Sequence, residues 1–431
     1  MALLILTAIL LSFFTFLAYI FHSRREYFKL VSKIGLEGPE PHWFLGNLKE
    51  IVERKQAIGY DDSNEWFGEL HKRFGDKFGM YFGKQMNIVV SNEEDVKEIF
   101  IKNFSNFSDR MGLTLDVIGK CAFAIDSNCQ RDRTEVFYVQ ARKFITNIDI
   151  RHSPVISSSL ILPELAWLWK SLYKYTGLAA AELPLVDGLS SVYEKRRAGE
   201  GAESIDLLKL LLDREDDKIK SMTKQEVIEN CFAFLLAGYE TTSTAMTYCT
   251  YLLSRNSDVQ RKLFEEILEV KETQGLTYDS IHEMKYLDAV YKETLRVYPP
   301  VIHFVNRVCL NDITIRGQFY PKGSCVTVLP YTVHRNEDNW PNASEFQPER
   351  FLDWNDKGGL KWIPFGVGPR YCVGMRFAEM EFKTTIAKLV ERFEMSMDGE
   401  PDLIPDCNGV IMRPKDPVRV TLSDRRRRSR Q

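Results

Sequence analysis

The chain has 431 residues, of which 44% are hydrophobic and 27% are charged, and its formal net charge is only −3. This composition is typical of a globular protein with a large core, so it excludes general disorder, and the length allows one large domain or two to three average ones. Because the charge is small and spread along the chain, it also excludes a molecule that binds nucleic acid through an overall basic surface.

The first residues are strongly apolar. Residues 1–21, MALLILTAILLSFFTFLAYIF, contain no charged side chain. As a helix at about 1.5 Å per residue they would span roughly 30 Å of hydrocarbon, so they predict a transmembrane signal anchor. The basic residues Arg24, Arg25, Lys29 and Lys33 all follow this run, which favours an uncleaved anchor with the remaining chain in the cytoplasm. The eight cysteines lack metal-type spacing and suit a reducing compartment.

A basic tether rich in proline and glycine follows over residues 22–50, and the globular domain is predicted over residues 51–424. Near the start of this domain, the alternation over residues 80–91 predicts a hairpin with its turn near Gly83. The segment SNEEDVKEIFIKN then predicts a helix with Ser91 as its N-cap.

Longer helical patterns begin near residue 204. The residues from Cys231 to Leu253 are apolar on nearly all sides, so their helix should run through the interior. A glycine and a glutamate interrupt this run, which weakens its interpretation as a second membrane span. Strand alternation returns over residues 311–330, and a basic tail over residues 425–431 is more typical of a mobile end than of a lipid or nucleic-acid site. The prediction is a mainly α protein with small β-sheets.

The stretch FGVGPRYCVG, residues 365–374, places Cys372 just before a predicted helix. The positive end of a helix stabilises the thiolate, which is the form of cysteine that binds metals. Glycines let the backbone approach a flat ligand, an aromatic ring shields one side of it, and an arginine can meet an anionic edge. A haem matches these demands, although a lone cysteine is more often a buried structural thiol. The other residues expected at the ligand are Phe365, Gly366, Arg370 and Gly374.

The pattern F-x-x-G-x-R-x-C-x-G resembles the haem-binding signature of the cytochrome P450 family, and the resemblance covers nearly the whole chain. It implies the cytochrome P450 fold, a b-type haem with Cys372 as the axial iron ligand, and a monooxygenase that inserts one atom of O2 into a small apolar substrate such as a xenobiotic, a steroid or a fatty-acid-like molecule. The branch it resembles is microsomal and drug-metabolising. That branch implies the endoplasmic reticulum membrane, electrons from NADPH through NADPH-cytochrome P450 reductase, and cytochrome b5 as a further partner.

The segment AGYETT resembles the oxygen-activation segment of the family. Ala233, Ala237 and Thr241 fall on one helical face and are small enough to admit a macrocycle. Glu240 and Thr241 then form a candidate proton-carrying pair, because an acid and a hydroxyl inside an apolar helix cost free energy unless they are paired. The structural alternative is that the threonine hydroxyl binds the carbonyl four residues back.

Two further motifs support the resemblance. Glu293 and Arg296 lie one helical turn apart, a spacing that alone most often gives a surface ion pair. Together with Arg350 in PERF, they resemble the buried Glu-Arg-Arg network of the family. The resemblance also implies that Arg307 and His334 lie near the haem edge.

The resemblance breaks between Arg110 and Met111, where a stretch that includes the helix C region of the family is missing. In the family this stretch holds a substrate-lining loop and a W-x-x-x-R motif that binds a haem propionate. No tryptophan fills that role here, since neither Trp66 nor Trp167 is followed by arginine at the fourth position. We therefore expect a shortened form with reduced or absent activity. The alternative function is an inactive relative that binds ligands or partners at the membrane.

Overall fold

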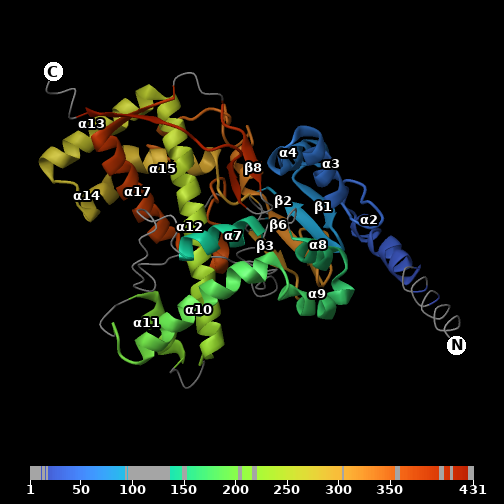
Figure 1. Ribbon diagram of the computed structural model, residues 1–431. Helices are drawn as coiled ribbons and strands as arrows, with labels where there is room; N and C mark the ends of the chain where they lie inside the picture. The colour runs from blue at the N-terminus through green and yellow to red at the C-terminus, as the bar shows by residue number, and fades with distance from the viewer. Residues whose placement is uncertain are drawn as a thin grey trace.

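The computed structural model describes residues 18–92, 136–147, 153–201, 206–215, 221–302, 305–354, 360–397, 402–407 and 411–425, together with residues 11, 15 and 95. The molecule is mainly helical, with a four-stranded sheet at the end from which the N-terminal helix projects (Figure 1). The predicted junction between Arg110 and Met111, most of the helix expected after Ser91, and the tail beyond residue 425 lie outside the described residues.

The helical part is built around α12, which spans Lys224–Arg255. This helix begins at a capping box, in which the Thr223 hydroxyl accepts the Glu226 N–H at 3.2 Å and the Glu226 carboxylate accepts the Thr223 N–H at 2.7 Å. Its buried side chains point to several sides, as the all-round apolar pattern predicted. The helices that contact it are α10 (Gly177–Arg197), α11 (Leu207–Glu215), α13 (Ser257–Thr273), α15 (Lys285–Val297) and α17 (Met375–Arg392).

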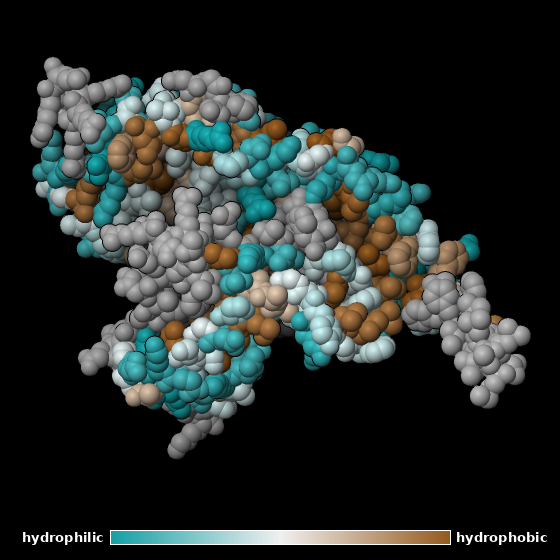
Figure 2. All heavy atoms as spheres, viewed as in Figure 1, coloured by the Kyte–Doolittle hydropathy of each residue, from teal (hydrophilic) through white to brown (hydrophobic). Residues whose placement is uncertain are grey.

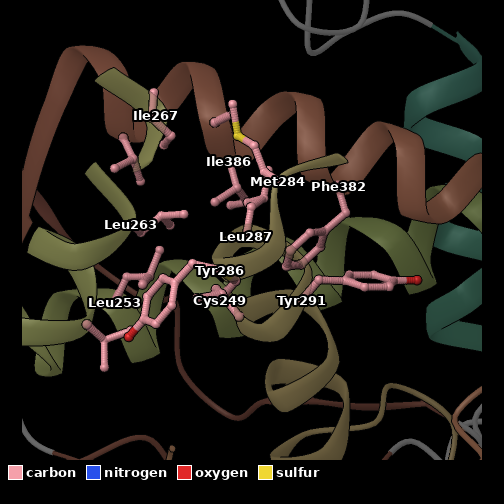
Figure 3. Close-up of a cluster of buried hydrophobic side chains, with 14 of the residues drawn as sticks. Cys249, Leu253, Leu263, Ile267, Met284, Tyr286, Leu287, Tyr291, Phe382 and Ile386 are labelled. Carbon is pink, nitrogen blue, oxygen red and sulfur yellow. The ribbon is translucent and has the colours of Figure 1, made fainter. Parts of the chain in front are cut away.

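A buried apolar cluster joins α12 to the last long helix, α17 (Figure 3). Phe382 and Ile386 of α17 lie against Leu287 of α15, and Cys249 and Leu253 of α12 belong to the same cluster. Each buried side chain of this size contributes about 1.5–3 kcal/mol relative to exposure. The cluster therefore fixes α17, and with it the loop that precedes its N-terminus.

The main sheet has the strand order β1-β2-β6-β3, in which β2 and β6 are parallel and the other neighbours are antiparallel. The predicted hairpin with its turn near Gly83 is confirmed, and so is the predicted strand region over residues 311–330. The strands of this sheet are β1 (Lys77–Phe82), β2 (Gln85–Val90), β3 (Val305–Val308) and β6 (Cys325–Val328). The two-stranded pairs are β4 (Ile313–Ile315) with β5 (Gln318–Tyr320), β7 (Phe393–Ser396) with β10 (Thr421–Asp424), and β8 (Pro405–Cys407) with β9 (Met412–Pro414).

Shorter helices surround these parts. At the N-terminal end they are α2 (Leu30–Lys33), α3 (Leu48–Ile58) and α4 (Ser63–Phe74). The middle of the chain adds α7 (Val136–Asn147), α8 (Pro154–Ile161), η3 (Pro163–Leu165) and α9 (Ala166–Tyr173). Around the site described below lie α14 (Tyr278–Glu283), α16 (Pro330–His334), η4 (Pro348–Phe351) and η5 (Gly368–Arg370).

One predicted cap is wrong. The side chain of Asn92, not that of Ser91, accepts the N–H of Asp95, at 2.8 Å. The Ser91 hydroxyl instead donates to the carboxylate of Asp76 at 3.0 Å, a contact made after the β1–β2 hairpin brings the two residues together. The Ser91 hydroxyl therefore makes a tertiary hydrogen bond, and the neighbouring Asn92 acts as the cap.

The predicted membrane anchor over residues 1–21 lies for the most part outside the described residues. Within the described part of the chain, no helix has both the length and the apolar character needed to cross a membrane.

The tether packs directly on the sheet. The Gly79 N–H of β1 donates to the Glu37 carbonyl at 2.9 Å, and a Cβ atom added at Gly38 would lie 1.8 Å from the Gly79 carbonyl oxygen. Only glycine permits this approach of two backbones.

Gly38→Ala should therefore push the tether off β1 and lower the free energy of unfolding by about 1–3 kcal/mol, measured by urea denaturation. Gly68→Ala is the matched control, because nothing lies within 4 Å of its added Cβ in the middle of α4. That control should stabilise the protein by about 0.5–1 kcal/mol. Equal effects at the two positions would contradict the close packing.

Candidate active site

The loop that carries Cys372 is a tight backbone structure immediately before α17. The Cys372 N–H donates to the Phe365 carbonyl at 2.8 Å, and the glycines Gly366 and Gly368 have φ values of 72° and 74°. These left-handed conformations favour glycine, which explains the fixed glycine of the motif at Gly368 and the additional glycine at Gly366. Gly374 is the N-cap residue of α17. The half-buried Cys372 thiol thus lies near the positive end of an 18-residue helix, where a thiolate is stabilised.

Residues from three other elements hold this loop in place. The Trp362 indole N–H donates to the Lys292 carbonyl of α15 at 3.0 Å, and the Ile363 N–H donates to Nε2 of His334 at 2.8 Å. Arg307 of β3 donates through Nη2 to the Val367 carbonyl at 3.2 Å. Phe365 is half-buried, with its ring centroid 6.3 Å from that of Trp362. The loop is therefore fixed from both the sheet and α15.

His334 is fully buried at the end of α16. Burial and the nearby Arg296 cation lower the pKa of its imidazole to about 3, so the ring is neutral at physiological pH. Because Nε2 accepts the Ile363 N–H, Nδ1 carries the hydrogen. This buried N–H makes no hydrogen bond of normal length and angle among the described residues, although the backbone carbonyls of Leu295 and Arg296 lie close enough to oppose the lowering of the ring's pKa.

The two arginines predicted for an anionic ligand edge differ in position. Arg307 is almost completely buried and lies against the Cys372 loop through Val367. Arg370, the last residue of η5, is exposed. The structure therefore places one cation inside, between the sheet and the loop, and one on the outer side of the loop.

The structure brings Glu293, Arg296 and Arg350 together. Glu293 and Arg296 are both completely buried, with a shortest N–O distance of 2.6 Å, and Nε of Arg350 lies 3.4 Å from the Glu293 carboxylate. Arg296 also donates to the carbonyls of His334 at 2.9 Å and Ala343 at 2.8 Å. A buried pair with these additional hydrogen bonds is not the surface ion pair that the spacing alone suggests. It ties α15 to the chain segments around α16 and η4.

On α12, the structure shows the structural alternative for Thr241. The Thr241 hydroxyl donates to the carbonyl of the buried Ala237 at 2.5 Å. The carboxylate of Glu240 lies 3.8 Å from Nη1 of Arg413 on β9. The acid and the hydroxyl are thus adjacent in sequence but each has its own partner.

Sequence reasoning missed Arg413 as a neighbour of this site. The β8–β9 pair is held against the segment that follows α15 by the hydrogen bond from the Met412 N–H to the Pro300 carbonyl, at 2.8 Å. Arg413 is separated from Glu240 by most of the C-terminal half of the chain, and no local pattern signals such a pairing.

The chain matches the family model described as Cytochrome P450 over residues 36–113 and 112–422. The two matched segments meet within a few residues of the predicted junction between Arg110 and Met111. Among curated proteins, the chain is 26% identical to Cytochrome P450 3A9 of Rattus norvegicus, over 84% of this chain and 86% of that protein. It is 27% identical to Cytochrome P450 6a2 of Drosophila melanogaster, over 91% and 94%. It is 30% identical to Cytochrome P450 3A12 of Canis lupus familiaris, over 86% and 76%.

These alignments also support a shortened chain. The alignment with Cytochrome P450 3A9 runs over 447 positions, although only 84% of the 431 residues take part in it. Tens of aligned positions in that relative therefore have no counterpart here.

Glu293→Ala should lower the free energy of unfolding by about 3–5 kcal/mol, because it leaves the Arg296 guanidinium buried without its carboxylate. Asp213→Ala is the control, since it breaks an exposed 2.7 Å ion pair with Lys209 on α11. Its effect should stay within about 0.5 kcal/mol. Chemical denaturation measures both variants, and a Glu293→Ala cost as small as the control would show that the pair does not hold the core.

Proposed function

The chain belongs to the cytochrome P450 family and is a monooxygenase of that family, and from this premise we propose that Cys372 is the axial ligand of a b-type haem iron. The observation that supports this assignment most strongly is the Cys372 loop. It holds a thiol beside the N-terminus of α17 and is itself fixed by His334, Arg307 and Trp362.

The described residues fit such a group. The loop offers one soft sulfur ligand, and Arg307 offers a buried cation next to the loop. The buried His334 holds the start of the loop by accepting the Ile363 N–H. When bound, the thiolate-ligated haem supplies the redox chemistry that splits O2. The family's W-x-x-x-R motif has no counterpart in the sequence. Arg307 and His334 would therefore contribute a larger share of the binding free energy at the propionate edge.

We assign the reaction as insertion of one oxygen atom into a C–H bond of a small apolar substrate. The second oxygen atom leaves as water, with two electrons from NADPH and two protons. The small side chains of Ala237 and of Ala233, one turn away, would let a flat ligand approach α12, and Thr241 and Glu240 would deliver protons to it. For Thr241 this requires that its hydroxyl turn from the Ala237 carbonyl toward the ligand side during turnover.

Electrons come from NADPH-cytochrome P450 reductase, with cytochrome b5 as a second donor, at the endoplasmic reticulum membrane. Two features support the membrane location. Residues 1–21 form an uncharged apolar run ahead of the tether, and hydrophobic residues gather on the surface at the end of the molecule from which the N-terminal helix projects (Figure 2). Exposed aromatic side chains occur on the tether and on α9, where Trp43 and Trp167 are 53% and 69% exposed.

The second candidate function is an impaired relative that binds ligands or partners without turnover. The shortened alignment and the missing W-x-x-x-R motif favour it. Each charge-assisted hydrogen bond lost at the haem edge costs about 1.5–3 kcal/mol of binding free energy. Haem content of the purified chain separates the two functions.

For the monooxygenase, the reduced protein should give the thiolate-haem absorption band with carbon monoxide, and Cys372→Ser should abolish it because the sulfur ligand is lost. Cys231→Ala removes a buried thiol on α12 and should leave the band unchanged. A band that survives in Cys372→Ser, or is absent from the unmodified chain, would contradict the assignment.

Thr241→Ala should lower product formation by about tenfold or more while NADPH oxidation by the reductase-supported enzyme continues. Thr247→Ala is matched, because its hydroxyl makes the same kind of bond to the carbonyl four residues back, at 2.8 Å to Ser243. It should keep the ratio of product to NADPH. If both variants retain that ratio, Thr241 does not carry protons.

A further inference from the structure

A buried arginine lies where the N-terminal helix meets the tether. Arg24 lies in the helical stretch of residues 18–27 and is completely buried. Its Nη1 donates to the Phe44 carbonyl, and its guanidinium lies 5.0 Å from the centroid of the Phe44 ring. Nε and Nη2, which form one edge of the guanidinium, have no acceptor among the described residues. Such an edge needs an oxygen partner, since an unpaired buried charge is costly.

Glu164 supplies an oxygen of the same kind. It lies in η3, between α8 and α9, and its Oε1 accepts the Lys84 ammonium of the β1–β2 turn at 2.6 Å. Its other oxygen, Oε2, is also buried and has no donor in the described part of the chain. The Gly83 N–H donates to the Leu45 carbonyl at 3.2 Å, so the residue that Arg24 binds, Phe44, and the residue that Glu164 binds, Lys84, each lie next to one end of the same hydrogen bond. The charge of Glu164 also opposes the lowering of the Arg24 pKa by burial.

The unpaired atoms of Arg24 and Glu164 determine which molecule can bridge the two side chains. A water molecule can accept from Nε and Nη2 of Arg24 and donate to Oε2 of Glu164, which satisfies every orphaned atom. A phosphate or another anion at the guanidinium edge would instead lie close to the Glu164 carboxylate and be repelled by it. The water-bridged ion pair is therefore favoured over an anion site.

We propose that Arg24, Glu164 and Lys84 form a charged latch that fixes the N-terminal helix to the α8–α9 segment. The latch joins three parts of the chain that meet at one end of the molecule, where α8 and α9 lie beside the hairpin of β1 and β2 (Figure 1). Exposed aromatic side chains occur on two of these parts. The ring centroids of Phe21 and Trp43 lie 5.6 Å apart. Trp167 lies on α9, and Tyr175 follows it closely in the sequence.

The purpose of the latch rests on the proposed membrane location. A fixed angle between the helix that follows the apolar run and α8–α9 lets both present their aromatic side chains to one bilayer surface. Without the latch, each part would meet the bilayer independently. The latch itself is a property of the folded chain and can be tested without reference to turnover.

Hydrogen exchange of the full chain in phospholipid nanodiscs tests the latch through reciprocity. Arg24→Gln should raise amide exchange over residues 163–173 by about tenfold, and Glu164→Gln should do the same over residues 20–28, since each loses a charge-assisted contact to the other segment. The double variant should exchange no faster than the single variants. Arg25→Gln is the matched control, because it removes the same charge from an exposed neighbouring position and should stay within about twofold of the unmodified chain.

Arg24→Gln behaving like Arg25→Gln, or a double variant whose effect is the product of the single effects, would overturn the latch. The carbon monoxide spectrum is recorded on the same samples. Failure of the proposed function then appears as a missing absorption band with the reciprocal exchange pattern retained. Failure of the latch appears as a lost pattern with the band retained.

Discussion

The site depends on one constraint, which is that the Cys372 thiol must be held at the positive end of α17. A thiolate in a protein interior is unfavourable unless dipoles or cations compensate its charge. The chain meets this requirement with backbone geometry. Two glycines with positive φ turn the loop so that the Cys372 N–H binds the Phe365 carbonyl and α17 begins directly afterwards.

A buried ion pair and its hydrogen bonds hold the Cys372 loop in place. Arg296 connects Glu293 with the carbonyls of His334 and Ala343, and His334 in turn accepts the N–H of Ile363 at the start of the loop. A disturbance of the Glu293–Arg296 pair would therefore reach the Cys372 loop through His334 and through the hydrogen bond of Trp362 to the Lys292 carbonyl beside Glu293. This arrangement gives a physical reason for a fully buried ion pair that adds little to stability when it is intact.

The sequence predicted the parts that depend on local patterns. The apolar helix around Cys231–Leu253, the hairpin near Gly83 and the turn-rich Cys372 loop all follow from periodicity and glycine placement, and the structure contains them. Contacts between distant segments gave no such signal. The Glu240–Arg413 and Lys84–Glu164 ion pairs join residues that are far apart in the sequence, and no local sequence pattern predicts either pair. The predicted cap at Ser91 failed for the same reason, because its hydroxyl donates to Asp76, a residue that is distant in the sequence.

The central claim is that the sulfur of Cys372 binds a haem iron in this shortened chain. X-ray absorption at the iron edge of the purified protein tests it most directly, because it reports the atoms bound to the metal. The account predicts about one iron per chain, with a single sulfur neighbour in addition to the four porphyrin nitrogens. An iron site with only nitrogen and oxygen neighbours, or a chain that takes up no iron when haem is supplied in excess, would contradict it.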